Sequence, residues 1–258
     1  MSNPHLPPEL LDHIVDLLHY RRNTLRNCCL VSRSWVPRTR KHLFADIKFS
    51  TARSLESWKE TFPDASTSPA RYAKTLLVGC PKAVTAVDAE AGGQWITGFS
   101  RVVALDVSGE MTHAGLVPFH GFSPFIKSLR VALTISPDSS QIFDLALSFP
   151  LLKNLTVDNY EPVYGPDGPS SVVHPLSSPT FTGSLELFMR GGMEPIVRRA
   201  LSLPGGIHFR RLTLKWYREE DPTLTMGLVE ECSHTLEYLG ITCGLICTPT
   251  RSVSTPRT

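Results

Sequence analysis

Three residues near the end of the sequence have side chains that could bind zinc together. Cys243 and Cys247 lie four residues apart, and His234 precedes them. A structural zinc site needs four ligands, and this pattern leaves the second pair incomplete. Cys243 also falls within a predicted strand. We therefore expect no metal site here.

The usual motifs of catalysis and cofactor binding are missing from the sequence. It has no Gly-x-Ser-x-Gly nucleophile turn, no Gly-x-x-x-x-Gly-Lys-Ser/Thr phosphate loop and no Gly-x-Gly-x-x-Gly dinucleotide motif. The acidic runs at 219–221 and 230–231 are best explained as solvated surface. We expect a protein that is not an enzyme and has no cofactor, so binding is the kind of function to look for.

Composition limits the kind of partner. The 258 residues are 41% hydrophobic and 19% charged, with a net charge of +2. These values are typical of a globular chain, and the near-neutral charge argues against nucleic acid as a partner of the whole protein. No secretory signal or apolar run of about 18 residues is present, so we expect no membrane partner and a cytoplasmic and/or nuclear location.

Residues 6–49 are predicted to form three short helices. Pro7 and Pro8 favour a helix start, and Thr24 is a possible N-cap of the second helix. Apolar residues of the first helix recur at helical spacing: Leu10, Leu11, Ile14, Val15, Leu17 and Leu18. A module of about 40 residues is marginal alone and usually needs a partner surface, unless this segment is simply the N-terminal lobe of a larger globular core.

The same segment resembles an F-box. The similarity lies in Leu6-Pro7-Pro8-Glu9-Leu10-Leu11, Ile14, Leu25, Cys29-Leu30-Val31, Arg33, Trp35, Arg40 and Leu43-Phe44. The resemblance implies docking on a Skp-type adaptor and, through it, on a cullin within an SCF-type cullin–RING ubiquitin ligase. The docking residues that it implies are Leu6, Pro7, Leu10, Ile14, Leu30, Val31 and Trp35. A local excess of arginine and lysine over residues 1–42 either steers this module toward an acidic protein surface or is a solvated rim.

A weak repeat begins at residue 73. Its core is Leu-x-Val/Leu/Ile, with anchors at Leu76, Leu105, Leu129, Leu155, Leu185, Leu212 and Leu239, which are 24–30 residues apart. Amphipathic segments at 141–149, 194–203 and 223–232 are predicted return helices, and 52–62 is a predicted packing helix. Repeats of this length and pattern are typical of leucine-rich repeats.

The chain therefore resembles F-box proteins with degenerate leucine-rich repeats. The predicted fold class is α/β: a three-helix F-box, then an irregular leucine-rich-repeat solenoid with a curved parallel sheet. The Asn or Cys expected five positions after each anchor is missing, and Tyr160 and Tyr217 stand there instead. A mixed α/β fold with coincidental strand spacing is the alternative.

The expected domains are an F-box at 5–49, a connecting helix and loop at 50–72, a repeat domain at 73–247 and a disordered tail at 248–258. Leu245 and Ile246 are expected to fold back as a minimal cap, unless the repeat array is shortened. Strand alternation predicts which side chains face an unknown protein target: Asp106, Arg130, Thr156, Asp158, Glu186, Thr213 and Lys215.

The resulting hypothesis is a substrate-recognition subunit that presents a protein target for ubiquitin-dependent degradation. Two other functions remain open. Residues 24–42 could form a basic helix-turn-helix for nucleic acid, although Trp35, Val36, Leu43 and Phe44 give it no polar reading face. The chain could also be a repeat scaffold unrelated to ubiquitination.

Overall fold

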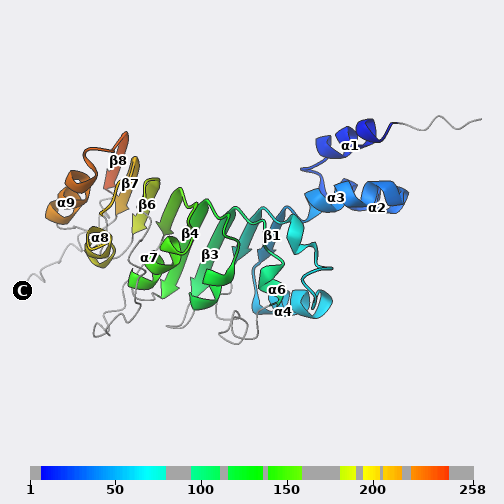
Figure 1. The fold of residues 1–258 in the computed structure, drawn as a ribbon, viewed down its shortest axis with the longest axis horizontal. Coiled ribbons are helices and arrows are strands. Elements are labelled where there is room, and N and C mark those ends of the chain that lie inside the picture. Colours follow the sequence, from blue (N-terminus) through cyan, green and yellow to red (C-terminus); the bar gives the residue numbers. More distant parts are fainter. Residues whose placement is uncertain are drawn as a thin grey trace, which may run out of the picture.

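The computed structural model describes residues 7–79, 94–110, 116–135, 139–158, 181–189, 194–203, 206–216 and 222–243. Within these residues the protein is α/β, and eight strands form one parallel sheet in chain order (Figure 1). The strands are β1 (Asp46–Phe49), β2 (Thr75–Val78), β3 (Ala104–Glu110), β4 (Ser128–Ile135), β5 (Asn154–Asp158), β6 (Ser184–Met189), β7 (Arg211–Trp216) and β8 (Tyr238–Cys243). The predicted parallel sheet is confirmed.

The strands of the sheet pair in the register that the sequence repeat predicts. All seven anchor leucines occupy one row across β2 to β8, and Ile47 of β1 extends this row by one strand. A second row two residues further on runs from Phe49 to Ile241. Because side chains alternate between the two faces of a strand, both rows point to the same side of the sheet.

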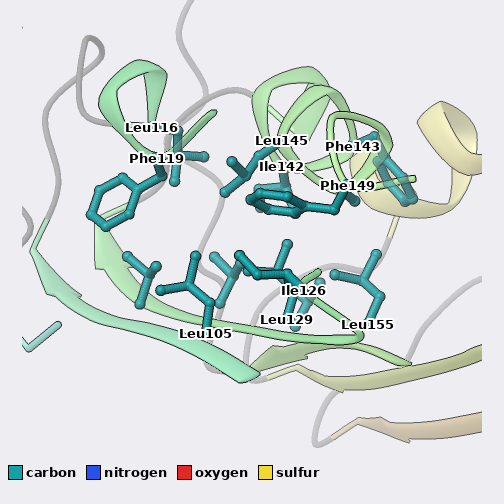
Figure 2. Packing of buried hydrophobic residues seen from close by; sticks show 14 of the residues in the cluster. Leu105, Leu116, Phe119, Ile126, Leu129, Ile142, Phe143, Leu145, Phe149 and Leu155 are labelled. Atoms are coloured by element: carbon teal, nitrogen blue, oxygen red, sulfur yellow. The ribbon is translucent and has the colours of Figure 1, made fainter. Parts of the chain in front are cut away.

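The helices that return the chain between strands cover that side of the sheet. They are α4 (Ala52–Thr61), η2 (Pro69–Tyr72), α6 (Gln94–Thr97), η4 (Val117–Gly121), α7 (Ser139–Leu147), α8 (Glu194–Leu201) and α9 (Pro222–Cys232). Figure 2 shows Leu105, Leu129 and Leu155 of the sheet facing side chains of η4 and α7. The predicted helices near 52–62, 141–149, 194–203 and 223–232 are confirmed.

The core is this interface between sheet and helices. From Leu76 to Leu214, the side chains of both strand rows are almost completely inaccessible to solvent. Burying one leucine stabilises a fold by about 1.5–3 kcal/mol, so the repeated rows supply much of the driving force for folding. The other face of the sheet carries no helix among the described residues and stays open to solvent.

Three further helices precede the sheet: α1 (Pro8–Leu17), α2 (Arg22–Val31) and α3 (Val36–Leu43), with the short η1 (Arg33–Trp35) between the last two. They stand beyond the β1 end of the sheet (Figure 1). The predicted N-cap at Thr24 is wrong, because α2 begins at Arg22 and its N-terminus has no side-chain cap. Residues 46–49 at the end of the predicted first module form β1.

The last strand leaves part of its apolar row uncovered. Leu239 and Ile241 are 41% and 48% exposed, since no described strand lies beyond β8. The predicted cap at Leu245 and Ile246 and the predicted tail at 248–258 lie outside the described residues. In the described part of the chain, no helix has both the length and the apolarity needed to cross a membrane.

Candidate protein-binding surfaces

The three N-terminal helices have a small core of their own. Val15 of α1 and Leu25 and Cys28 of α2 are buried there. Thr39 of α3 is also buried, and its hydroxyl donates a 2.7 Å hydrogen bond to the carbonyl oxygen of Trp35. The short helix η1, which contains Trp35, contacts α1, α2 and α3.

Asp16 fastens α1 to α3. Its carboxylate accepts hydrogen bonds from Nε of Arg38 at 2.6 Å and from Nε2 of His42 at 2.7 Å. A second nitrogen of Arg38 contacts the other carboxylate oxygen, so the guanidinium binds the carboxylate through two atoms. These hydrogen bonds, above all those from Arg38, hold the pKa of Asp16 well below its usual range. The ion pair fixes the orientation of the first helix.

Most of the predicted docking residues are exposed. Leu30 and Val31 at the end of α2 are 86% and 69% exposed, and Leu10 on α1 is 51% exposed. Pro7 and Ile14 are also exposed, whereas Trp35 is half-buried and Leu6 lies outside the described residues. Leu30 and Val31 are the last two residues of α2, Trp35 lies in the following η1, and η1 also contacts α1.

Two further apolar residues of this module are exposed and were not predicted as docking residues. Leu17 and Tyr20 are 58% and 67% exposed. Leu17 follows Leu10 and Ile14 at helical spacing, so the same periodicity could have placed it with them. The exposed apolar stripe of α1 thus extends to its C-terminal end.

The basic residues of the module have different roles. Arg38 is held by Asp16, and Arg22 donates a 2.9 Å hydrogen bond from Nη2 to the carbonyl oxygen of Asp46. That bond ties α2 to the first strand. The others are exposed: Arg21, Arg26, Arg33, Arg40 and Lys41. The module therefore exposes positive charge as well as apolar side chains.

Aromatic packing joins the module to the sheet. The ring of Phe44, directly after α3, lies 6.3 Å from that of Trp58 on α4 in an edge-to-face arrangement. Trp58 in turn packs against Phe49 of β1 at 5.6 Å. Such aromatic pairs contribute about 0.5–1.5 kcal/mol each beyond their buried area. The module is held at the end of the sheet by packing.

The predicted target-binding residues lie together on the open face of the sheet. Asp106, Arg130, Thr156, Glu186 and Thr213 occupy one row across β3 to β7. Asp158 and Lys215 lie two residues further along their own strands, on the same face. Other side chains of this face were not predicted from the sequence, among them Lys48, Arg211 and Tyr238. The same strand alternation could have identified them.

Ion pairs join charged side chains of three neighbouring strands in the middle of this face. Arg130 of β4 bridges two carboxylates: its Nη1 lies 3.3 Å from Asp106 on β3, and its Nη2 lies 2.6 Å from Asp158 on β5. Burial raises the pKa of Asp106, against the opposing effect of Arg130. On the next pair of strands, the Thr156 hydroxyl donates a 3.4 Å hydrogen bond to Glu186.

The described residues bring together no group of three or more His, Cys, Asp or Glu side chains suited to a metal. Of the three residues considered for zinc, His234 is exposed after α9, and Cys247 lies outside the described residues. The two surfaces that stand out are the apolar module and the open face of the sheet.

Comparison with known proteins does not assign the chain to a family. Protein-family models, curated proteins and solved structures were all searched, and none matched the chain.

Proposed function

We propose that this chain is the substrate-recognition subunit of an SCF-type cullin–RING ubiquitin ligase. In this proposal the N-terminal module is an F-box that docks on a Skp-type adaptor. The sheet and its helices are an irregular leucine-rich-repeat solenoid that holds a protein target.

One observation carries the proposal. The two side chains of the Leu30-Val31 pair, central to the F-box resemblance, are more exposed than any other large apolar side chain described. Exposing leucine and valine to water is unfavourable, and neighbouring exposed apolar residues are typical of a protein interface. The neighbouring Trp35 is half-buried, as expected for a residue that supports an interface from below.

The rigidity of the module also supports this function. The Asp16 ion pair fixes α1, and the Phe44–Trp58 contact holds the three helices against the sheet. A ligase must hold its target at a defined place relative to the ubiquitin-transferring enzyme, and a rigid connection between the two binding surfaces would serve that need. The open face of the sheet offers the surface for the target.

A pull-down with a Skp-type adaptor tests the proposal. We expect the purified wild-type chain to retain the adaptor and the Leu30→Asp/Trp35→Ala variant to lose it. Because Trp35 is half-buried, a Leu30→Asp/Val31→Asp variant should be tested beside it. A folded wild-type chain that does not bind the adaptor would exclude the proposal, and salt-dependent binding to duplex DNA would support the helix-turn-helix alternative instead.

A further inference from the structure

The chain enters the neighbouring strands β4 and β5 through turns of the same form. The turns are Ser123-Pro124-Phe125-Ile126 before β4 and Phe149-Pro150-Leu151-Leu152 before β5. In each turn the amide of the fourth residue donates a hydrogen bond to the carbonyl oxygen of the first, at 3.4 Å and 3.0 Å respectively. Proline at the second position favours this geometry. The third residues of the two turns, Phe125 and Leu151, are therefore structurally equivalent.

Both of these equivalent side chains are exposed. Phe125 is 52% and Leu151 is 45% accessible to solvent, whereas the fourth residue of each turn packs into the core or against it. The amide of Lys153, directly after the second turn, donates a 2.8 Å hydrogen bond to the carbonyl oxygen of Lys127, directly after the first. The chain therefore leaves the two turns about 4.8 Å apart, which is the spacing of neighbouring strands. The edge of the sheet where β4 and β5 begin thus carries two exposed apolar side chains.

Three cations lie at the same edge. Lys127 and Lys153 are exposed. Arg101 is also exposed and is the third residue of the turn before β3, where the carbonyl oxygen of Ser100 accepts a 2.9 Å hydrogen bond from the hydroxyl of Ser123. Within the part of the chain that the structure describes, none of these three cations forms an ion pair. The edge therefore has a charge of about +3 beside its two apolar side chains.

This combination suits a protein segment that carries apolar and acidic side chains together. Covering an exposed phenylalanine or leucine is favourable because it removes apolar surface from water. Ammonium and guanidinium groups form charge-assisted hydrogen bonds with carboxylates. Lys127 and Lys153 are like charges on neighbouring strands, so a carboxylate between them reduces their repulsion as well as attracting both.

The same edge is less suited to a nucleic acid. Single strands bind by stacking their bases on aromatic rings, and Leu151 offers no ring. The strands that follow these turns also carry carboxylates, Asp106 on β3 and Asp158 on β5, which would repel phosphates. The chemistry of the edge therefore favours an acidic protein segment.

We infer that the edge where β4 and β5 begin binds a protein segment in which an aromatic or large aliphatic residue lies within three residues of an aspartate or glutamate. The apolar side chain packs on Phe125 and Leu151, and the carboxylate contacts Lys127 and Lys153. The lysines stand two residues beyond the apolar positions, a distance of roughly 7 Å, which an extended segment covers in two or three residues. This inference rests on the proposed function in one respect only: the segment is taken to belong to the target protein.

Selection of random peptides of about twelve residues displayed on phage, with the full-length chain immobilised, tests the inference. We expect the selected peptides to carry the apolar–acidic pair at this spacing about tenfold more often than the starting library. A Lys127→Gln/Lys153→Gln variant should lose the enrichment of aspartate and glutamate and keep the apolar preference. A Phe125→Asn/Leu151→Asn variant should lose the apolar preference.

Two matched controls remove the same kinds of side chain elsewhere. Lys41→Gln/Lys74→Gln removes two exposed lysines, Leu17→Asn/Met226→Asn removes two exposed apolar side chains, and both should select the same peptides as the wild type. Thermal melting verifies that each variant is folded.

The inference is overturned if the wild type enriches no peptides, if the enriched peptides lack the pair, or if the variants of the edge select the same peptides as the wild type. Binding of a single-stranded oligonucleotide that is lost in Lys127→Gln/Lys153→Gln would also overturn it. Adaptor binding is measured separately. A chain that selects the pair without binding an adaptor contradicts only the proposed function, and one that binds the adaptor without selecting the pair contradicts only the inference.

Discussion

The carboxylate of Asp16 accepts a 2.6 Å hydrogen bond from Nε of Arg38, and this ion pair joins α1 to α3. Replacing Asp16 with asparagine removes the charge, and we expect α1 to lose about 1–2 kcal/mol of local stability. Hydrogen exchange should show faster exchange of α1 amides while the strands keep their protection. The control is Asp12→Asn, because Asp12 lies 4.0 Å from Arg38 and is half-exposed. Equal effects of the two variants would show that the close ion pair has no special role.

The ion pair between Asp16 and Arg38 also predicts that the stability of α1 depends on pH. The pKa of Asp16 is lowered in the folded protein, so the charged form is favoured by folding. The stabilisation is fully present above the ordinary aspartate pKa of about 4 and is lost as the pH falls toward the lowered value. We therefore expect wild type and Asp16→Asn to differ in α1 protection at pH 7 and to approach each other progressively as the pH falls from about 4 toward the lowered pKa of Asp16. A difference that grows on acidification would contradict this assignment.

Two leucines in the same row of the sheet should respond differently to one substitution. Leu212 of β7 is fully buried, whereas Leu239 of β8 is 41% exposed. Leu212→Ala leaves a cavity between sheet and helices and should lower the free energy of unfolding by about 2–5 kcal/mol. Leu239→Ala should lower it by about 1 kcal/mol or less, since its side chain is only partly covered. Urea denaturation of both variants measures the contrast, and similar losses would mean that β8 is covered in solution.

Two glycines form another matched pair. A Cβ atom on Gly183 would lie 1.7 Å from the carbonyl oxygen of Lys153, where the chain enters β6. That oxygen also accepts a 2.6 Å hydrogen bond from the amide of Ser184, so neither backbone can move away without breaking the register. We expect Gly183→Ala to cost about 3 kcal/mol or more.

Gly227 in the middle of α9 is the control. A Cβ atom there meets only Cδ1 of Leu201, at an ordinary contact distance of 3.7 Å. Because alanine favours helices, Gly227→Ala should raise the free energy of unfolding by up to about 1 kcal/mol. Urea denaturation again measures both variants. A Gly183→Ala protein as stable as wild type would show that the strands do not approach this closely.

The sheet could be predicted from sequence because each strand from β2 to β8 carries an anchor leucine that sets its register. Asp106 and Arg130 each follow an anchor leucine by one residue, so equal offsets place them side by side once the strands align. Strand β1 was left out of the predicted repeat domain because it carries Ile47 and Phe49 instead of leucine and directly follows the helical module.

The ion pair of Asp16 could not be predicted in the same way. Asp16 and Arg38 lie on different helices, and their contact depends on how α1 crosses α3. Helical periodicity identifies the faces of each helix but carries no information on the angle between two helices. The exposure of Leu30 and Val31 has the same origin, because it depends on which parts of α2 its neighbours leave uncovered.

Calorimetric titration of the purified chain with a Skp-type adaptor tests the central claim most directly. Wild type should bind, and Leu30→Asp/Val31→Asp should weaken binding at least about 100-fold because both side chains would be buried in the interface. The matched control is Leu151→Asp, an exposed leucine before β5, which should change the affinity less than about twofold. If the folded wild type does not bind the adaptor, or if both variants bind equally well, the account is contradicted.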